Sequence, residues 1–262
     1  MSEHPIAIER PGHAALRIVA TPGRSSITPA SRLCLTVIDD RSDLLRGRGL
    51  DWGSGTGVLS VAAATHPAVE FILGLELDAD EVATARTNAE LNGVADRCGF
   101  LVSDSYDPFP DQNASSLRSL LGSTDFLIAN PPTSPGNDGL GWRRRVLAGA
   151  LDYLVPGADV LLQVSRQYGT ERTQRLATDV GGYEYRELLG KTEWVPFDQS
   201  RQDLREALAG YAAEEARSGE KYTFLHPSGD REIDARQAME LYQTTGESSL
   251  SQWRMHRLTR LI

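Results

Sequence analysis

A glycine-rich turn between a predicted strand and a predicted helix constrains the fold of this chain most strongly. Glycines occupy positions 53, 55 and 57, directly after the short segment of residues 50–52. Glycine adopts backbone conformations that other residues avoid, and it lets a ligand lie against bare main chain. A helix that begins at such a turn directs free N–H groups toward it, and these favour an anionic ligand group. The segment therefore predicts a strand, a ligand-binding turn and a helix.

The sequence after this turn alternates between strand and helix patterns. Apolar runs and helical spacing predict strands at 69–75, 99–102, 124–129 and 158–164, and helices at 57–65, 79–92 and 140–153. This alternation favours a parallel, doubly wound α/β sheet. In such sheets, ligands bind outside the carboxyl ends of the strands, so we expect the functional residues there.

Both ends of the chain are predicted to add elements to this sheet. Thr28 and Pro29 suit the N-cap and first position of a helix, and residues 1–45 are interpreted as an N-terminal extension and helix that cover the site. The catalytic domain is expected over 46–262, with helical additions from about 196 to the end. The later elements are predicted as a helix at 169–179, a strand within 184–195, helices at 200–218, 232–243 and 249–261, and a strand at 222–225.

The composition narrows the class of protein. The chain has 262 residues and a formal net charge of −9, and a global negative charge disfavours nucleic acid as a partner. No apolar run reaches the length of about 20 residues that crosses a bilayer. Its two cysteines, Cys34 and Cys98, lack metal-like spacing and suggest a reducing compartment. We therefore expect a cytoplasmic protein that binds neither a membrane nor a metal.

Two carboxylates follow the next predicted strands. Glu76 stands at the end of the second strand and Asp104 at the end of the third. A carboxylate at the end of the second strand can accept hydrogen bonds from the two hydroxyls of a ribose. Asp78 is expected to cap the helix that begins at about 79, and Asp107 is a competitor of Asp104.

The most specific motif follows the fourth strand, where Asn130 precedes Pro131 and Pro132. Each proline favours an extended backbone in the residue before it, so the segment forms a stiff platform. The side-chain oxygen of Asn130 and the carbonyl oxygen of Pro131 can both accept N–H bonds from one amine or amide nitrogen. The motif thus predicts a site that fixes a nitrogen atom.

These motifs, over about residues 25 to 165, resemble those of class I S-adenosylmethionine (SAM)-dependent methyltransferases with an Asn-Pro-Pro motif, above all the catalytic domains of ribosomal-protein and glutamine N-methyltransferases. The resemblance implies a seven-stranded, Rossmann-like sheet with SAM across the carboxyl ends of its strands. It implies that Asp51 helps to hold the amino end of SAM, Glu76 its ribose and Asp104 its adenine. The implied cofactor-binding residues are Asp51, Gly53, Gly55, Gly57, Glu76, Asp104 and Asn130. Asn130 and Pro131 are the implied catalytic residues.

One departure from the family pattern concerns the acceptor. Related enzymes follow the Asn-Pro-Pro motif with an aromatic residue that stacks on a planar target, whereas this chain has Thr133. The departure disfavours a flipped base or planar amide and favours a small molecule or an aliphatic amine. A ring from elsewhere is an alternative, although such aromatics usually belong to the core. The candidates are Trp142, Tyr153, Tyr168 and Trp194.

Other residues near this motif receive a structural interpretation. Glycines within residues 134–141 suggest a mobile lid. Arg143, Arg144 and Arg145 are expected on a solvated helix face, with a clamp on a substrate anion as the alternative. His66 and His226 are interpreted as structural.

The sequence therefore predicts an enzyme that moves the methyl group of SAM to a nitrogen of a small-molecule or protein acceptor. Two alternatives stay open. The amine of SAM could attack its own γ-carbon, giving azetidine-2-carboxylate and methylthioadenosine, as in azetidine-2-carboxylate synthases of this fold. The chain could also bind SAM without catalysis. Neither the acceptor nor the oligomeric state follows from the sequence.

Overall fold

A mostly parallel sheet forms the centre of the computed structural model, which describes residues 5–20, 27–110, 112, 114–134 and 138–262. The strands of this sheet are β3 (Gly47–Trp52), β4 (Val69–Glu76), β5 (Cys98–Asp104), β6 (Asp107–Pro108), β7 (Thr124–Ala129), β8 (Leu154–Gln163), β9 (Tyr183–Lys191) and β14 (Arg254–Arg260). In the described part of the chain these eight strands lie in the order β6, β5, β4, β3, β7, β8, β14, β9. Seven strands remain when the two-residue β6 is left out, and this confirms the predicted seven-stranded, Rossmann-like sheet.

The sheet is parallel from β5 to β8 and antiparallel at β14. β3 lies between β4 and β7, so its end adjoins the ends of both neighbours. Trp52 is in register with Leu75 of β4 and with Ala129 of β7. The glycine-rich turn, Glu76 and Asn130 therefore emerge side by side at one edge of the sheet.

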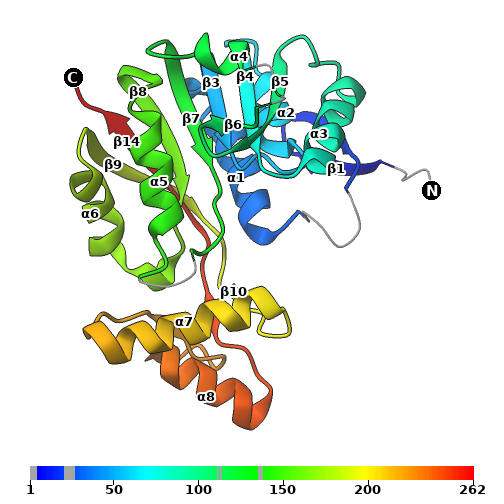
Figure 1. The fold of residues 1–262 in the computed structure, drawn as a ribbon. Coiled ribbons are helices and arrows are strands. Elements are labelled where there is room, and N and C mark those ends of the chain that lie inside the picture. The colour runs from blue at the N-terminus through cyan, green and yellow to red at the C-terminus, as the bar shows by residue number, and fades with distance from the viewer. Residues whose placement is uncertain (1–4, 21–26, 111, 113, 135–137) are drawn as a thin grey trace.

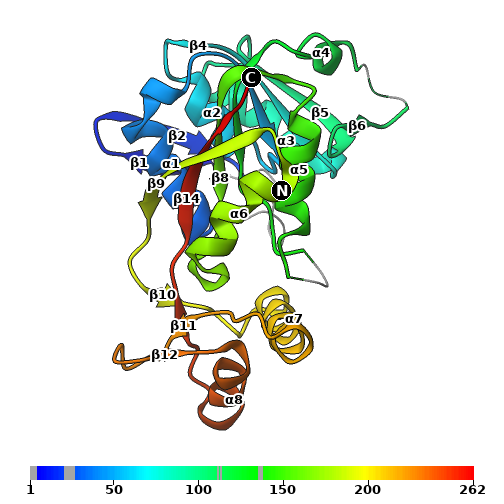
Figure 2. The same cartoon turned by 90° about the vertical axis from the view of Figure 1, so that its left-hand side faces the viewer.

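Helices cover both faces of the sheet (Figures 1 and 2). The helices are α1 (Pro29–Asp40), α2 (Val58–Ala64), α3 (Ala79–Leu91), α4 (Ser115–Arg118), α5 (Gly141–Ala150) and α6 (Thr170–Val180), with short 3-10 turns η1 (Ser42–Leu44) and η2 (Arg166–Tyr168). Apolar residues of α1, α2 and α3 pack into one core, and those of α5 and α6 pack into a second. Burial of the sheet on both faces explains the apolar runs of its parallel strands.

The N-terminal residues form a hairpin of β1 (Ile6–Arg10) and β2 (His13–Ile18), followed by α1. Thr28 is the N-cap of α1, and its hydroxyl accepts a hydrogen bond from the backbone N–H of Ser31. The predicted start of this helix is confirmed. α1 packs against α2, β9 and β14, and β2 packs against α3. That residues 1–45 cover the site stays a prediction.

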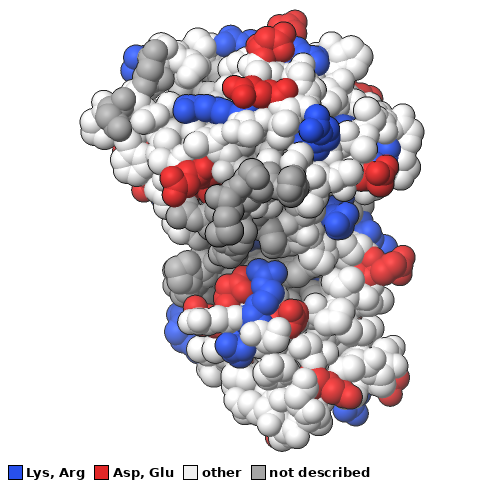
Figure 3. Space-filling view, turned by 90° about the vertical axis from the view of Figure 1, so that its right-hand side faces the viewer, with Lys and Arg blue, Asp and Glu red and all other residues white. Residues whose placement is uncertain are grey.

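A small lobe lies beyond the carboxyl ends of the parallel strands (Figure 1). It contains β10 (Val195–Pro196), α7 (Gln202–Ser218), β11 (Phe224–Leu225), β12 (Glu232–Ile233), α8 (Ala235–Thr245) and β13 (Leu250–Ser251). Its strands form a second sheet in the order β10, β13, β11, β12. On the face in Figure 3, acidic and basic side chains are interspersed, and the molecule narrows between the lobe and the main body.

The C-terminal segment differs from the prediction. The prediction of a helix over 249–261 is wrong, because these residues form β13 and then β14. β14 returns from the lobe into the main sheet. Met255 packs into the core beside α1, whereas Leu258 packs into the core on the opposite face. A strand buried on both faces can show apolar residues three apart, and that spacing imitates a helix. None of the described helices combines the length and apolar character that crossing a bilayer requires.

Candidate active site

The glycine-rich turn joins β3 to α2 in a conformation that favours glycine. Gly53, Gly55 and Gly57 have φ angles of 70°, 52° and 76°. A Cβ atom at Gly57 would lie 2.8 Å from side-chain atoms of Ala85 and Phe100, so α3 and β5 pack directly against this position. A Cβ atom at Gly53 would meet nothing within 4 Å. The turn is therefore closely packed on one side and open at Gly53.

Glu76 lies at the end of β4 and holds the glycine-rich turn. Its Oε2 atom accepts a hydrogen bond from the backbone N–H of Gly55 at 2.8 Å. Its Oε1 atom accepts hydrogen bonds from the N–H groups of Leu77 at 2.7 Å and Asp78 at 3.0 Å. Each carboxylate oxygen can accept further bonds. The structure thus places Glu76 beside the turn, and its binding of a ribose stays a prediction.

Asp51 is a buried carboxyl group beneath the same turn, 1% exposed. Its Oδ2 atom accepts hydrogen bonds from the backbone N–H of Ser60 at 3.1 Å and from the Ser60 hydroxyl at 2.6 Å. Its Oδ1 atom has no partner among the described residues. Burial raises the pKa of Asp51 to about 7; nearby Glu76 adds to this shift, and the Ser60 hydrogen bonds oppose it. A nearby cation would favour the charged form of this group.

The end of β5 holds Asp104 and a strained residue that the sequence did not indicate. The Asp104 side chain is 55% exposed and forms an ion pair of 3.1 Å with Arg145. The next residue, Ser105, has a φ of 61°, which is unusual for a residue other than glycine. Its hydroxyl accepts a hydrogen bond from Nε1 of Trp52 at 2.7 Å. This bond ties Ser105 to Trp52, the residue before the glycine-rich turn, at the edge of the sheet where the adenine is predicted to lie.

Asn130 follows β7 directly, and Ala129 before it is in register with Trp52, the residue before Gly53. The Asn130 side chain is half-buried. Among the described residues, no hydrogen bond engages its amide group. The structure therefore brings Asn130 beside the glycine-rich turn with its amide available to a ligand.

Arg143 of α5 fixes the segment after Asn130, which was not expected from the sequence. Its side chain is buried, and its Nη2 and Nη1 atoms donate to the carbonyl oxygens of Pro131 and Pro132, each at 3.0 Å. The same guanidinium donates to the backbone carbonyl of Gln163 at 2.9 Å and to its side-chain oxygen at 2.8 Å. A solvated position for Arg143 is therefore wrong. A carbonyl oxygen has two lone pairs, so the predicted acceptance of a substrate N–H by Pro131 remains a prediction.

The two neighbouring arginines also form ion pairs. Arg144 binds the carboxylate of Asp138, which lowers the pKa of Asp138 against the opposing effect of its burial. Arg145 pairs with Asp104, and its guanidinium lies over the ring of Trp142, 5.6 Å from the centroid. Of the three arginines, Arg145 best matches the expected exposed helix face.

Thr133 connects the Asn-Pro-Pro segment to the lobe. Its hydroxyl lies 2.9 Å from the hydroxyl of Tyr211 on α7 and 3.4 Å from that of Tyr168. The Tyr168 and Tyr211 hydroxyls are 2.7 Å apart, and both rings are buried. The ring of Tyr222 stacks on Tyr211 at a centroid distance of 4.4 Å. The residue that replaces the family's stacking ring is thus a contact point for the lobe.

The predicted lid spans residues 134–141, of which 135–137 lie outside the described residues. The N–H of Ser134 donates to the carbonyl of Gly139 at 3.2 Å, and the Ser134 hydroxyl accepts from the N–H of Trp142. A Cβ atom at Gly139 would lie 3.0 Å from atoms of both Tyr168 and Tyr211. The described parts of this segment are therefore held at both ends, and its mobility stays a prediction.

The aromatic residues named as alternative stacking partners take different places. Tyr153 and Tyr168 belong to the core, as aromatics at such positions usually do. Trp194 lies under the guanidinium of Arg166, 5.1 Å from the centroid. Trp142 is the second residue of α5 and packs beside Trp52, with ring centroids 6.2 Å apart. Trp142 thus contacts Trp52, the residue before the glycine-rich turn.

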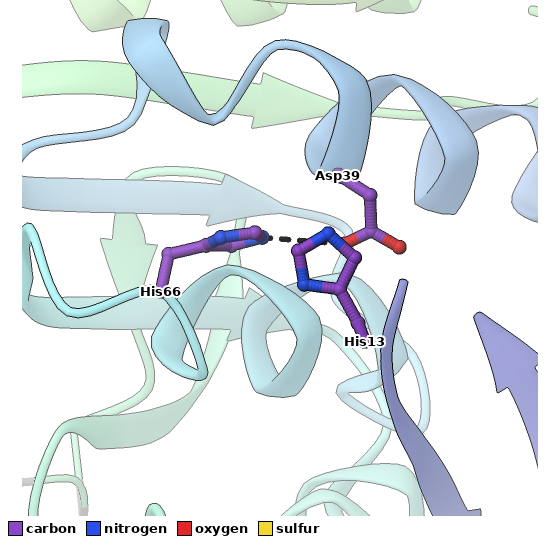
Figure 4. Close-up of side chains that lie close together, drawn as sticks. All are labelled: His13, Asp39 and His66. Carbon is purple, nitrogen blue, oxygen red and sulfur yellow. Dashed lines mark hydrogen bonds and ion pairs between the residues drawn. The ribbon is translucent and has the colours of Figure 1, made fainter. Parts of the chain in front are cut away.

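A second polar cluster lies away from this site and joins the hairpin to the main body (Figure 4). The side chains of His13, Asp39 and His66 approach within 4.8 Å of one another. Arg10 occupies both oxygens of Asp39, through Nε at 2.9 Å and through Nη2. It also donates to the hydroxyl of Thr65 at 3.0 Å. A cation here would have to displace this buried guanidinium, so we interpret the cluster as the attachment of the hairpin.

Comparison with known proteins shows the family. The profile described as "Methyltransferase small domain" matches residues 17–188, and the chain belongs to that family. It is 32% identical over 158 residues to a ribosomal protein L11 methyltransferase of Dechloromonas aromatica, covering 59% of this chain and 45% of that protein. It is 35% identical to one of Haemophilus influenzae over 128 residues, 48% of this chain and 39% of the other. The chain spans less than half the length of these relatives.

Two solved structures share the fold. A methyltransferase from Pyrococcus furiosus matches with a TM-score of 0.53 and 16% identity, over 94% of this chain and 88% of the other. The [4+2]-cyclase SpnF matches with a TM-score of 0.51 and 20% identity, over 100% of this chain and 88% of the other. These two likenesses show the fold alone. Membership of the methyltransferase small domain family, matched over residues 17–188, supports an enzyme of the class I SAM-dependent methyltransferases with S-adenosylmethionine as its cofactor.

The residues at the glycine-rich turn fit this cofactor. Oδ1 of Asp51 and the hydroxyl of Ser54 belong to residues near Gly53 in the sequence, and both are buried without a partner among the described residues. Acceptors of this kind can hold the ammonium group of SAM directly or through a water. When bound, SAM supplies an electrophilic methyl group on its sulfonium. The chain's own task is to hold the turn rigidly, through Glu76, and to align an acceptor.

Proposed function

We propose that this methyltransferase acts on a nitrogen atom of a small-molecule amine or of a protein side chain. The position of Asn130 carries the proposal: it follows β7, beside the end of β3, and no internal hydrogen bond of the described residues engages its amide. The amide oxygen can accept an N–H bond from an acceptor and direct the nitrogen lone pair toward the cofactor. Its dipole also favours the positive charge that develops on nitrogen during transfer.

The rigidity of the segment supports this role. Asn130 stands between the end of a central strand and two prolines whose carbonyls are fixed by the buried Arg143. Alignment of nucleophile, methyl carbon and sulfur is the main requirement of such a transfer, and small displacements reduce its rate strongly. The bonds from Arg143 therefore serve catalysis through the position of Asn130, without contact with the acceptor.

The surroundings of Thr133 favour an acceptor that is not a planar base. The Thr133 hydroxyl is directed to Tyr211 and Tyr168, and these two rings are buried in the core. Tyr211 stacks on Tyr222 and meets Tyr168 edge to face, so these rings do not present an open platform for a base. We therefore favour an aliphatic amine as the acceptor. The name of the curated relatives makes ribosomal protein L11 the protein acceptor to test.

The experiment compares the wild-type protein with Asn130→Ala and with a control away from the strand ends, Asn92→Ala. Each protein is incubated with SAM and with a pool of small amines or with purified L11, and S-adenosylhomocysteine and methylated products are measured by mass spectrometry. We expect Asn130→Ala to retain cofactor affinity and to lose about 10²–10³-fold in turnover, as for removal of an oriented polar group. Asn92→Ala should retain turnover. Unchanged turnover in Asn130→Ala would remove Asn130 from the mechanism.

A further inference from the structure

Asn88 of α3 is a buried side chain that joins three parts of the molecule. It is 0% exposed. Its Nδ2 atom donates to the carbonyl of Thr56 at 2.9 Å and to the carbonyl of Val19 at 3.0 Å. Its Oδ1 atom accepts from the N–H of Val19 at 2.7 Å. Asn88 therefore connects α3 to the glycine-rich turn and to the segment that follows β2.

The bond from Asn88 to Thr56 holds the glycine-rich turn between two of its glycines. Thr56 lies between Gly55, whose N–H is bound by Glu76, and Gly57, whose N–H donates to the carbonyl of Ser54 at 2.8 Å. The flanking glycines have little conformational preference of their own, so hydrogen bonds from outside must fix the peptide planes. Glu76 fixes the turn at Gly55, and Asn88 fixes it at Thr56.

We propose that Asn88 is a positioning residue for the cofactor and that it couples cofactor binding to the docking of the Val19 segment, which follows β2. Asn88 acts through the turn and does not bind the cofactor itself. The same amide group of Asn88 binds both Thr56 and Val19. A ligand that fixes the glycine-rich turn therefore also fixes Asn88, and Asn88 in turn holds Val19 more firmly. Such coupling is reciprocal, so a docked Val19 segment also favours the conformation of the turn that binds the ligand. The inference does not depend on the identity of the methyl acceptor.

The same helix offers a matched control one turn later. Asn92 binds β2 in the same way, since its Nδ2 atom donates to the carbonyl of Arg17 at 2.8 Å and its Oδ1 atom accepts from the N–H of Arg17 at 2.9 Å. Among the described residues, Asn92 has no hydrogen bond to the glycine-rich turn. Asn92→Ala thus removes the attachment of β2, together with the bond from Asn92 Nδ2 to the backbone carbonyl of Asn88 at 2.7 Å, and leaves the bond from Asn88 to Thr56 in place.

The test measures binding of S-adenosylhomocysteine by isothermal titration calorimetry to the wild type, Asn88→Ala and Asn92→Ala. We expect Asn88→Ala to weaken binding about tenfold or more, since one buried hydrogen bond corresponds to roughly that factor. Asn92→Ala should stay within about twofold of the wild type, the range expected when no bond to the turn is lost. Equal effects of the two substitutions, or no effect of Asn88→Ala, would overturn the proposal.

Hydrogen exchange of the wild-type protein tests the coupling even if Asn88→Ala fails to fold. The N–H of Val19 is bound by Asn88 and that of Arg17 by Asn92. The exchange rate of the Arg17 amide therefore serves as the internal reference for that of the Val19 amide. Adding S-adenosylhomocysteine should slow exchange more at Val19 than at Arg17. Equal slowing at both amides would mean general stabilisation and would contradict the coupling. This readout requires no acceptor, so it is independent of the proposed function.

Discussion

Replacement of Arg143 by methionine removes the guanidinium that holds the Asn-Pro-Pro segment while keeping an unbranched side chain. The substitution deletes the hydrogen bonds to the carbonyls of Pro131, Pro132 and Gln163 and to the Gln163 side chain. These acceptors lie at a side chain that is 2% exposed, so water does not replace the lost donors without rearrangement.

The magnitude follows from this burial. A hydrogen bond that involves a charged group contributes about 1.5–3 kcal/mol, but bonds that share one guanidinium do not add fully. The partners of Arg143 are all neutral oxygens, so its removal leaves unsatisfied buried acceptors, each of which costs about 1–3 kcal/mol, and no unpaired charge. Because these costs do not add fully, we expect Arg143→Met to lower the free energy of unfolding by about 3–5 kcal/mol. Arg143→Lys keeps the positive charge but lacks the planar guanidinium, so its free energy of unfolding should lie between those of the wild type and Arg143→Met.

Urea denaturation of the wild type, Arg143→Met and the control Arg145→Met measures this loss. Arg145 is an exposed neighbour on the same helix, and its ion pair with Asp104 should contribute less than about 1 kcal/mol. A loss in Arg143→Met that is no larger than in Arg145→Met would refute the reasoning. If Arg143→Met is too unstable to purify, the difference between Arg143→Lys and Arg145→Lys gives the same comparison.

Three further predictions follow from the site. Tyr211→Phe removes the bond to Thr133 and should lower turnover several-fold without changing S-adenosylhomocysteine affinity. Tyr222→Phe should keep turnover, because the Tyr222 hydroxyl has no hydrogen bond to Thr133 among the described residues. Equal activities of the two variants would contradict this prediction. The pKa of Asp51 is about 7 in the folded protein, against a usual value of 3.8. Between pH 3.8 and about pH 7, the folded protein therefore retains a proton on Asp51 that the unfolded chain releases. The contribution of Asp51 thus lowers stability as the pH rises through this window. Asp51→Asn should remove this part of the slope in thermal unfolding between pH 4.5 and 7.5, and an unchanged slope would show that the carboxyl is not responsible. Gly55→Val should abolish cofactor binding in calorimetry while the circular dichroism spectrum stays that of a folded protein, because a β-branched residue disfavours a φ of 52°; normal affinity would mean that the cofactor site lies elsewhere.

The sequence predicted the parts of the site that a parallel sheet brings together. Gly53 and Asn130 follow β3 and β7, Glu76 is the last residue of β4, and the register of β3 with β4 and β7 places the three strand ends side by side. This result needs only the order of the strands and the rule that ligands bind at their carboxyl ends. The alternation of strand and helix patterns predicted a parallel, doubly wound sheet, and the structure supplies the order of its strands.

The supporting residues could not be predicted in the same way. Arg143, Tyr211 and Asn88 act through hydrogen bonds to backbone or hydroxyl groups that are distant in sequence, and nothing in their local pattern distinguishes them from surface residues. Arg143 in particular lies in a run of three arginines, which suggested a solvated face. Its burial depends on how α5 packs against β8, which is a property of the tertiary structure.

The last strand shows a different limit. β14 is buried on both faces, so its apolar residues lack the alternation that identifies a half-buried strand. The lobe between β9 and β14 also separates this strand from the rest of the sheet in sequence. Local spacing alone therefore indicated a helix, and only the pairing of β14 with β8 and β9 resolves it.

The most direct test of the account is mass spectrometry of the purified protein with SAM alone and then with added amines or L11. The account predicts that S-adenosylhomocysteine forms only when an acceptor is present and that the acceptor gains the mass of one methyl group on nitrogen. Methylthioadenosine formed above the enzyme-free background without any acceptor would contradict methyl transfer and make SAM itself the substrate.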